Sequence, residues 1–220
     1  MLNHPLLKNK RIYLFDFDGT LVDSMPTWSG IHVNALKNAG IEVPENFVQT
    51  IPPLGNFRAS QYTMSFGLDI SLEDYLAHVS KTLYDAYTTH IALRPGVREK
   101  LLELKAAGHS LNVLTASPHD YLDPCLRRHG IYNLFDNVWT IDDFGYTKAQ
   151  TIIYTTAAQR LGAAVDRCIF VDDNATAVDT ARQAGMQTIG IFDETSRDFA
   201  PQLKAAAHLY IEEFSQIPCP

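Results

Sequence analysis

The chain has 220 residues, 46% of them hydrophobic, which is enough for one large domain or a core with a smaller insert. Its formal net charge of −7 argues against a nucleic-acid-binding protein that works through a broad basic surface. The three cysteines are widely spaced and form no C-x-x-C pair, so a disulfide framework or a zinc site is not expected and a reducing compartment fits best.

The N-terminal segment MLNHPLLKNKR has neither the long apolar stretch nor the small-residue cleavage site of a signal peptide. No apolar run reaches the length of a membrane span. We therefore expect a soluble, cytoplasmic protein with no membrane or nucleic-acid partner, either a monomer or a small homo-oligomer.

The apolar segment IYLF (12–15) predicts a buried strand, and this strand runs directly into Asp16 and Asp18. A sharp turn follows at Gly19 and Thr20. Carboxylates seldom lie at the end of a buried strand unless a charged partner accompanies them. Two residues that are two positions apart share a face of extended chain, so both acids can serve one ligand.

Residues 25–93 predict a mainly helical insert, because they contain two helical patterns and no convincing strand. The segment TWSGIHVNALKNAG is typical of a helix that ends at Gly40. A second helix is predicted over ISLEDYLAHVSKTLYDAYTTH, with Ser71 as its N-cap and Asp74 at its third position.

From Arg94 onward, helical and strand patterns alternate, which predicts a parallel sheet covered by helices on both faces. The fold class is therefore α/β, with a Rossmann-like core (1–24 and 94–220) and a small α-helical insert (25–93). Helices are expected to stop at Gly108, Gly162 and Gly185, and the helix that stops at Gly162 is expected to begin at Lys148. The predicted strands are HSLNVLTAS (109–117), NVWTID (137–142), RCIFVDD (167–173) and QTIGIF (187–192).

The segment SPHDYLDPCLRRHG predicts a helix that begins with a capping box. Ser117 is the expected N-cap, Pro118 takes the first helical position and Asp120 the third. Pro124 falls inside this helix, so a break or kink is expected there.

Ligands of an open parallel sheet bind beyond the carboxyl ends of the strands. Several carboxylates crowded at that edge repel one another and call for a divalent cation, and oxygen ligands alone favour Mg²⁺. A lysine and hydroxyl groups nearby suit an anionic substrate group, towards which an aspartate can act as nucleophile and a second aspartate as general acid and base. The polar residues expected at this edge are Asp16, Asp18, Thr115, Ser117, Lys148, Asp172 and Asp173.

Four segments resemble the motifs of the haloacid dehalogenase superfamily, and the resemblance covers nearly the whole chain. DFDGTLVDS is similar to the first motif, D-x-D-G-T-L-x-D-S, and LNVLTAS to the second. Lys148 resembles the lysine of the third motif, and IFVDDNATAVDTARQAGM is similar to the fourth. The insert after the first motif resembles a helical cap, as in the phosphoglycolate phosphatase and beta-phosphoglucomutase-like branch.

The resemblance implies a phosphoric monoester hydrolase in which Asp16 is the nucleophile and Asp18 the general acid and base. It also implies Mg²⁺ as the cofactor, with Asp16, Asp18 through its backbone carbonyl, Asp173 and Asp172 as the metal residues. The expected substrate is a small phosphate ester. Thr115 and Lys148 are implied to be catalytic residues that hold the phosphoryl group. The residues implied or considered for binding the substrate are Gly19, Thr20, Arg58, Thr115, Ala116, Ser117 and Lys148.

Several departures from the family pattern keep alternatives open. The third motif often reads K-P-x-P, whereas this chain has KAQT, so Lys105 is an alternative to Lys148. Trp28 stands where related sugar-phosphate mutases carry a cap histidine, and Pro118 where they carry a lysine, which weakens a mutase interpretation. Arg58 follows a G-x-x-R spacing that resembles the substrate-specificity loop of related caps, where an arginine can bind a second anionic group.

Two alternatives of other classes are a phospho-accepting signalling receiver and a non-catalytic binding protein. In receivers the acid pair comes first in the chain, whereas here the order is Asp, Thr, Lys and then the acid pair. The sequence does not choose among phosphoglycolate, sugar phosphates and nucleoside monophosphates as substrates.

Overall fold

The computed structural model describes residues 12–51 and 54–219, which form two compact units. The sheet unit runs up to Asp23 and resumes at Ala92, and the helical unit is Ser24–Ile91. Parts of the predicted core (1–11 and 220) and of the predicted insert (52–53) lie outside the described residues.

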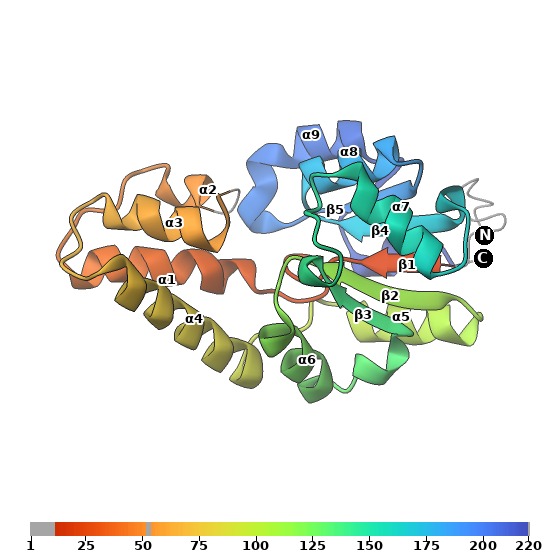
Figure 1. Ribbon diagram of the computed structural model, residues 1–220, viewed down its shortest axis with the longest axis horizontal. Coiled ribbons are helices and arrows are strands. Elements are labelled where there is room, and N and C mark those ends of the chain that lie inside the picture. The colour runs from red at the N-terminus through yellow and green to blue at the C-terminus, as the bar shows by residue number, and fades with distance from the viewer. Residues whose placement is uncertain (1–11, 52–53, 220) are drawn as a thin grey trace. The chain divides into compact units, whose positions relative to one another are not determined.

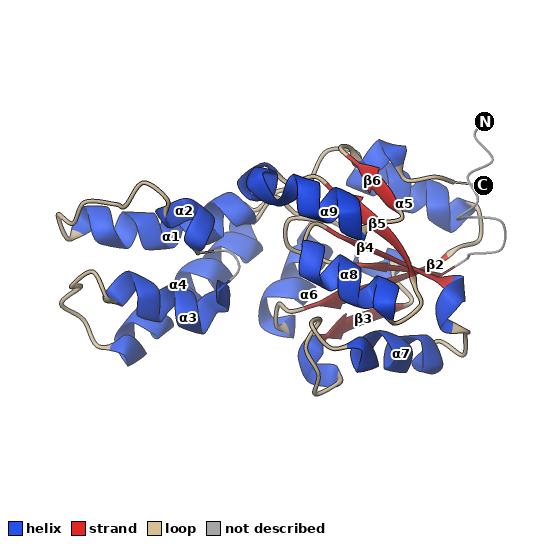
Figure 2. Ribbon diagram, turned by 90° about the horizontal axis from the view of Figure 1, so that it is seen from above, coloured by secondary structure: helices blue, strands red, loops and turns tan. Residues whose placement is uncertain are grey.

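The sheet unit is built on six parallel strands in the order β3-β2-β1-β4-β5-β6, with helices on both sides (Figures 1 and 2). The predicted α/β, Rossmann-like fold is confirmed. The strand order reverses between β1 and β4, and it differs from the 2-1-3-4-5 order of receiver domains, which removes that alternative. The strands are β1 (Ile12–Phe15), β2 (Ser110–Thr115), β3 (Asn137–Thr140), β4 (Cys168–Asp172), β5 (Gln187–Ile191) and β6 (Leu209–Ile211).

The helices of the sheet unit follow the predicted alternation with the strands. They are α5 (Val97–Ala106), α6 (His119–Arg128), α7 (Thr151–Arg160), α8 (Ala175–Gln183) and α9 (Ala200–Ala206). The helix α9 and the strand β6 were not predicted, because seven and three residues are too few to give a clear periodic pattern.

Side chains of β1 alternate between the two faces of the sheet, and both faces are buried. Leu14 belongs to a core cluster on one face that includes Phe170 of β4 and Tyr154 of α7. On the other face, the ring of Phe15 lies 6.5 Å from that of Phe135 and 5.7 Å from that of Phe214. Burial on both faces explains why these strands read as continuous apolar runs.

The helical unit contains α1 (Met25–Asn38), α2 (Phe47–Thr50), α3 (Gly55–Met64) and α4 (Leu72–Thr89). Ser71 caps α4 as predicted, because its hydroxyl oxygen accepts a hydrogen bond from the backbone N–H of Asp74 at 3.1 Å. Leu36, Phe47 and Ala59 form a small core that joins α1, α2 and α3. The helices α2 and α3 were not predicted, since short helices give weak periodicity.

Two local predictions about helix starts are wrong, and the break expected at Pro124 is absent. The N-cap of α6 is Pro118 and not Ser117, whose hydroxyl is used elsewhere. The same helix continues past Pro124 to Arg128, so the predicted break is absent; a proline removes only one intrahelical hydrogen bond from so short a helix. Lys148 lies in a turn before α7, which begins at Thr151.

A pair of glycine substitutions tests the close packing of α9 on β5. A Cβ atom on Gly190 would lie 2.8 Å from Cγ of Leu203, whereas one on Gly30 in α1 meets nothing within 4 Å. We expect Gly190→Ala to lower the free energy of unfolding by about 1–3 kcal/mol through overpacking. The control Gly30→Ala should raise it by about 0.5–1 kcal/mol through helix propensity. Denaturant unfolding followed by circular dichroism measures both, and an unchanged Gly190→Ala protein would contradict the packing.

Candidate active site

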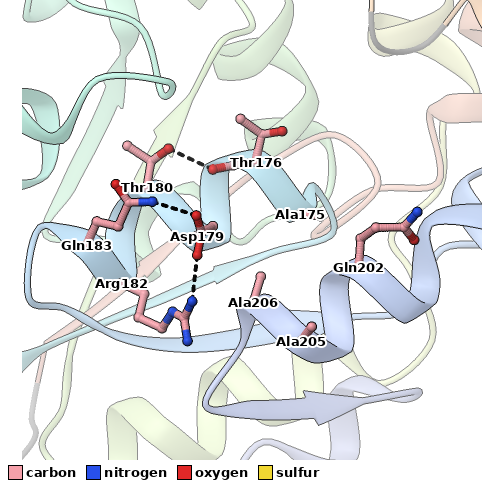
Figure 3. Close-up of a pocket in the computed structure, with 9 residues that line it drawn as sticks. All are labelled: Ala175, Thr176, Asp179, Thr180, Arg182, Gln183, Gln202, Ala205 and Ala206. Atoms are coloured by element: carbon pink, nitrogen blue, oxygen red, sulfur yellow. Dashed lines mark hydrogen bonds and ion pairs between the residues drawn. The ribbon is translucent and has the colours of Figure 1, made fainter.

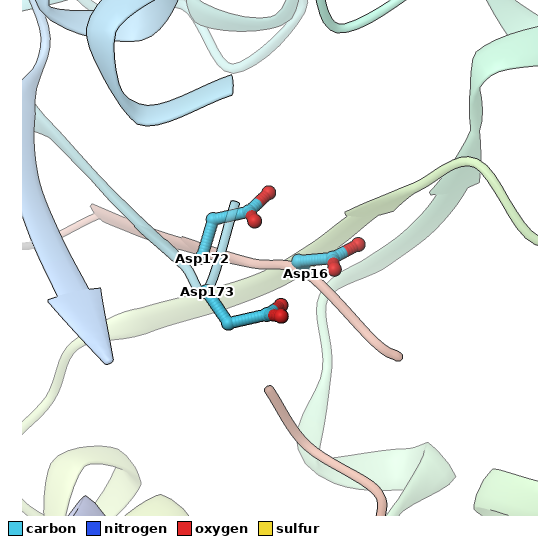
Figure 4. Close-up of side chains that lie close together, drawn as sticks. All are labelled: Asp16, Asp172 and Asp173. Carbon is cyan, nitrogen blue, oxygen red and sulfur yellow. The ribbon is translucent and has the colours of Figure 1, made fainter. Parts of the chain in front are cut away.

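Three carboxyl groups lie together at the carboxyl ends of β1 and β4 (Figure 4). Phe15 pairs with Val171 in the sheet, so the residues that follow them, Asp16 and Asp172, come side by side. The backbone N–H of Asp16 donates to the carbonyl of Val171 at 2.9 Å, which continues the ladder by one residue. One carboxylate oxygen from each of Asp16, Asp172 and Asp173 lies within 4.8 Å of the others.

Lys148 lies between two of these acids. Its Nζ is 2.7 Å from Oδ1 of Asp16 and 2.8 Å from Oδ2 of Asp172. The turn that carries it is held by Tyr154 of α7, whose hydroxyl donates to the carbonyl of Lys148 at 2.8 Å. The alternative lysine, Lys105, pairs instead with Asp136 at the surface, so the structure brings Lys148 and not Lys105 to Asp16.

The charges of this cluster depend on one another. Burial opposes the charge on Lys148, but Asp16 and Asp172 outweigh it and hold the pKa of Lys148 above its usual value. Burial raises the pKa of Asp172, against the pull of Lys148. Burial also raises the pKa of Asp173 well above its usual value, and repulsion from the neighbouring acids, including Asp193, adds to this effect.

The two members of the acid pair have different partners. Asp172 is fully buried and is held by Lys148 and by the backbone N–H of Asn174, which donates to its Oδ1 at 2.7 Å. Asp173 accepts a hydrogen bond from the hydroxyl of Thr20 at 3.3 Å. Neither acid caps the following helix, because Asn174 is the N-cap of α8.

Gly19 is the point at which the turn after β1 touches Asp173. Its φ of +70° lies in the left-handed region that favours glycine. A Cβ atom on Gly19 would lie 2.6–2.9 Å from the carboxyl atoms of Asp173, closer than real contacts allow. The backbone conformation favours glycine, and the contact with Asp173 leaves no room for a Cβ atom, so the turn places the Asp18–Thr20 segment against Asp173.

Asp18 is joined to the end of β2. The hydroxyl of Ser117 donates to Oδ2 of Asp18, and the backbone N–H of Ser117 donates to the Oγ1 of Thr115 at 3.1 Å. Thr115 and Ser117 are buried, and Ala116 between them is exposed. The contact to Asp18 explains why Ser117 does not cap α6.

Arg58 belongs to the helical unit and lies in the first turns of α3, where its side chain is exposed. The predicted specificity loop is therefore the start of a helix. The site residues that the structure brings together all belong to the sheet unit, and the role of Arg58 stays a prediction.

Two residues near the cluster were missed by the sequence analysis. Asp193 follows β5 and is buried, and its Oδ1 accepts a hydrogen bond from the backbone N–H of Thr195 at 2.9 Å. The rule that polar residues at strand ends form the site would have found it. Arg94 donates to the carbonyls of Gly19 and Phe192, a role that no local pattern indicates.

A separate groove of about 540 Å³ lies between α8 and α9 (Figure 3). Its lining includes Asp179, which pairs with Arg182 at 2.7 Å and accepts a hydrogen bond from Gln183 at 2.6 Å. None of the strand-end acids lines it, so it does not belong to the candidate site.

The strand-end cluster fits an oxygen-liganded divalent cation. Burial and mutual repulsion act against the charge of Asp173, and a cation would supply the positive charge that the carboxylates lack. Carboxylate oxygens are the ligands that Mg²⁺ prefers.

These features define an α/β enzyme whose acidic site lies at the switch point of a Rossmann-like sheet. The model of the haloacid dehalogenase-like hydrolase family matches residues 13–191, so the chain belongs to that family. The predicted superfamily and the prediction of a hydrolase are thereby confirmed.

Among curated relatives, the phosphoglycolate phosphatase of Colwellia psychrerythraea is 26% identical over 209 residues, covering 89% of this chain and 92% of its own. Pyrophosphatase PpaX of Bacillus velezensis is 28% identical over 191 residues, covering 84% and 85%. The crystal structure of a predicted phosphoglycolate phosphatase from Haemophilus somnus superposes with a TM-score of 0.82 at 22% identity, covering 96% and 97%. In the described part of this chain, no helix combines the length and apolar character needed to cross a membrane.

The charge state of Asp173 predicts a pH-dependent effect on stability. Because its folded-state pKa is raised above the unfolded value of 3.8, the metal-free wild type loses stability as pH rises from that value through the folded pKa. Asp173→Asn removes this loss, so with metal chelated its advantage in unfolding free energy should be larger at about pH 8 than at about pH 4.5. A tenfold difference in proton affinity corresponds to about 1.4 kcal/mol, and we expect a gap of that order.

Denaturant unfolding with a chelator at both pH values measures this gap. Asp179→Asn is the matched control, because the hydrogen bond from Arg182 lowers the pKa of the exposed Asp179. Removing this carboxylate should therefore lower the free energy of unfolding, and the loss should be no smaller at about pH 8 than at about pH 4.5. An Asp173→Asn advantage that does not grow with pH would show that Asp173 carries no buried charge.

Proposed function

We propose that this protein is a Mg²⁺-dependent phosphatase that hydrolyses a small phosphomonoester through a phosphorylated Asp16. The observation that carries the proposal is the position of Asp16, which meets Lys148 at 2.7 Å and lies beside the acid pair Asp172 and Asp173. The names of the curated relatives, phosphoglycolate phosphatase and pyrophosphatase, support phosphoryl transfer to water.

In the first step, a carboxylate oxygen of Asp16 attacks phosphorus. A bond from that oxygen to phosphorus forms, and the bond from phosphorus to the ester oxygen breaks. Asp18, protonated at this stage, gives its proton to the departing oxygen, so the alcohol leaves neutral. The hydrogen bond from Ser117 orients the carboxyl group of Asp18.

In the second step, Asp18 takes a proton from a water molecule, whose oxygen attacks phosphorus. The bond between phosphorus and Asp16 breaks, which releases inorganic phosphate and restores the carboxylate. Lys148 donates to the phosphoryl oxygens in both steps and offsets their negative charge. Thr115, Ala116 and Ser117 would line the phosphoryl group from the end of β2.

The residues that would hold Mg²⁺ are Asp16, Asp173 and the backbone carbonyl of Asp18. The cation, when bound, would screen the repulsion between the attacking carboxylate and the phosphoryl oxygens. Asp172 is already occupied by Lys148 and Asn174, so we assign it to holding the lysine and supporting the metal residues, not to direct ligation. Gly19 and Thr20 keep Asp173 in place.

We also propose that the helical unit is a cap that selects the substrate. A cytoplasmic location and a monomeric or small homo-oligomeric state remain predictions from the sequence.

Replacement of the nucleophile tests the proposed chemistry. Asp16→Asn should lower phosphate release by roughly 1,000-fold or more, because an amide oxygen does not attack phosphorus effectively. A screen of phosphomonoesters with and without Mg²⁺ first identifies an ester that the wild type hydrolyses. When that ester is labelled with ³²P and the reaction is quenched with acid, the wild type should carry a label that is stable to acid and removed by hydroxylamine. Circular dichroism checks the fold of the variant, and Asp123→Asn on α6 serves as control. Parental turnover by a folded Asp16→Asn protein would disprove the nucleophile.

Arg58 is proposed to bind a second anionic group of the substrate. For a substrate such as phosphoglycolate, Arg58→Ala should raise KM by about tenfold, since charge-assisted hydrogen bonds to a carboxylate are lost. For p-nitrophenyl phosphate, which has no second anion, KM should change by less than about twofold. Equal changes for both esters would remove Arg58 from substrate recognition.

A further inference from the structure

Arg94 joins two loops of the sheet unit that are far apart in the sequence. One of its guanidinium nitrogens donates to the carbonyl of Gly19 and the other to the carbonyl of Phe192. The first carbonyl belongs to the turn after β1, and the second follows β5. Arg94 is half-buried, so these charge-assisted bonds are partly shielded from water.

The backbone around Arg94 is itself fixed to the segment that follows the turn. Its N–H donates to the carbonyl of Leu21 at 3.0 Å, and Leu93 forms an antiparallel bridge with Val22. The side chain therefore starts from a defined position and reaches back across the turn to Gly19.

The turn at Gly19 has little freedom to move without changing the site. Asp18 precedes Gly19 and Thr20 follows it, and Thr20 donates a hydrogen bond to Asp173. The Cα hydrogens of Gly19 face the carboxyl group of Asp173, where no Cβ atom would fit. A shift of the Gly19 carbonyl would thus move the backbone of Asp18 relative to Asp173.

The second carbonyl belongs to the residue before another acid that acts on Asp173. Phe192 immediately precedes Asp193, whose negative charge acts on Asp173. Phe192 is fixed through its N–H, which donates to the carbonyl of Ile211 of β6 at 2.9 Å. Arg94 therefore ties the turn to a segment that is itself hydrogen-bonded to β6.

We infer that Arg94 is a positioning residue that holds the Asp18–Thr20 turn against Asp173 by bridging the Gly19 and Phe192 carbonyls. The inference rests on the proposed function for its kinetic consequence. Its structural consequence is independent of turnover, because the turn also carries the backbone carbonyl proposed to face the cation. Two separate nitrogens with fixed geometry are needed to reach two carbonyls, and lysine offers only one nitrogen.

The test compares Arg94→Lys with Arg98→Lys, since both substitutions keep the positive charge. Arg98 is a matched control: it lies four positions along the chain and also donates to a backbone carbonyl, that of His129, away from the site. With an ester that the wild type hydrolyses, Arg94→Lys should lower kcat by about tenfold and change KM by less than about threefold. Arg98→Lys should leave both constants within about twofold.

Mg²⁺ binding measured by titration calorimetry gives a second readout that needs no turnover. We expect Arg94→Lys to weaken binding by about fivefold and Arg98→Lys to leave it unchanged, because only the former loosens the turn. Thermal unfolding verifies that both variants are folded at the assay temperature.

The outcomes separate this inference from the proposed function. A folded Arg94→Lys protein with parental kcat and parental Mg²⁺ affinity would overturn the positioning role, even if the wild type is an active phosphatase. A wild type that binds Mg²⁺ but hydrolyses no ester would refute the proposed phosphatase activity. In that case, a Mg²⁺ affinity that is weakened in Arg94→Lys and unchanged in Arg98→Lys would still support the positioning role of Arg94.

Discussion

The organisation of the site depends on the crowding of three carboxyl groups, two of them buried and Asp173 partly buried, at the ends of two adjacent strands. Such a cluster is unfavourable in a protein interior unless positive charge accompanies it. Lys148 supplies one positive charge, at 2.7 Å from Asp16 and 2.8 Å from Asp172. Because the lysine is shared by these two acids, the third acid, Asp173, is left with a hydroxyl partner and a raised pKa. The crowding of negative charge therefore explains why a lysine lies in the site and why the site is suited to binding a cation.

The topology of the sheet determines which acids share that constraint. A parallel sheet delivers the carboxyl ends of all its strands to one edge, and the reversal of strand order makes β1 and β4 neighbours although 150 or so residues separate them along the chain. The register then fixes the detail, because pairing of Phe15 with Val171 aligns Asp16 with Asp172. A register shift of one residue would turn one of the two acids to the other face of the sheet.

Most of the sheet unit could be predicted because its strands are buried on both faces and read as short apolar runs that end in polar residues. That pattern located Asp16, Thr115, Lys148 and the Asp172–Asp173 pair. What it could not predict was the partner of each group. Ser117 has the spacing of a helix cap, and local sequence does not reveal that the carboxylate of Asp18, 99 residues away, takes its hydroxyl instead. Arg94 is similar, since bonds from a side chain to distant carbonyls leave no periodic trace. Short elements such as α2 and β6 escaped because periodicity needs more residues than they contain.

Gly19, which stands between Asp18 and Thr20 in the turn after β1, links the sequence to the chemistry of the site most directly. A left-handed φ alone would favour glycine at position 19 without excluding asparagine. The contact with Asp173 is stricter, because any Cβ atom would overlap the carboxyl group. The absence of a side chain thus lets the backbone of the first motif approach the acid of the fourth within contact distance. The glycine of the D-G-T sequence is therefore required for packing against the acidic cluster as well as for the turn. Because Asp18 precedes this glycine, the same contact also fixes the position of Asp18 relative to Asp173.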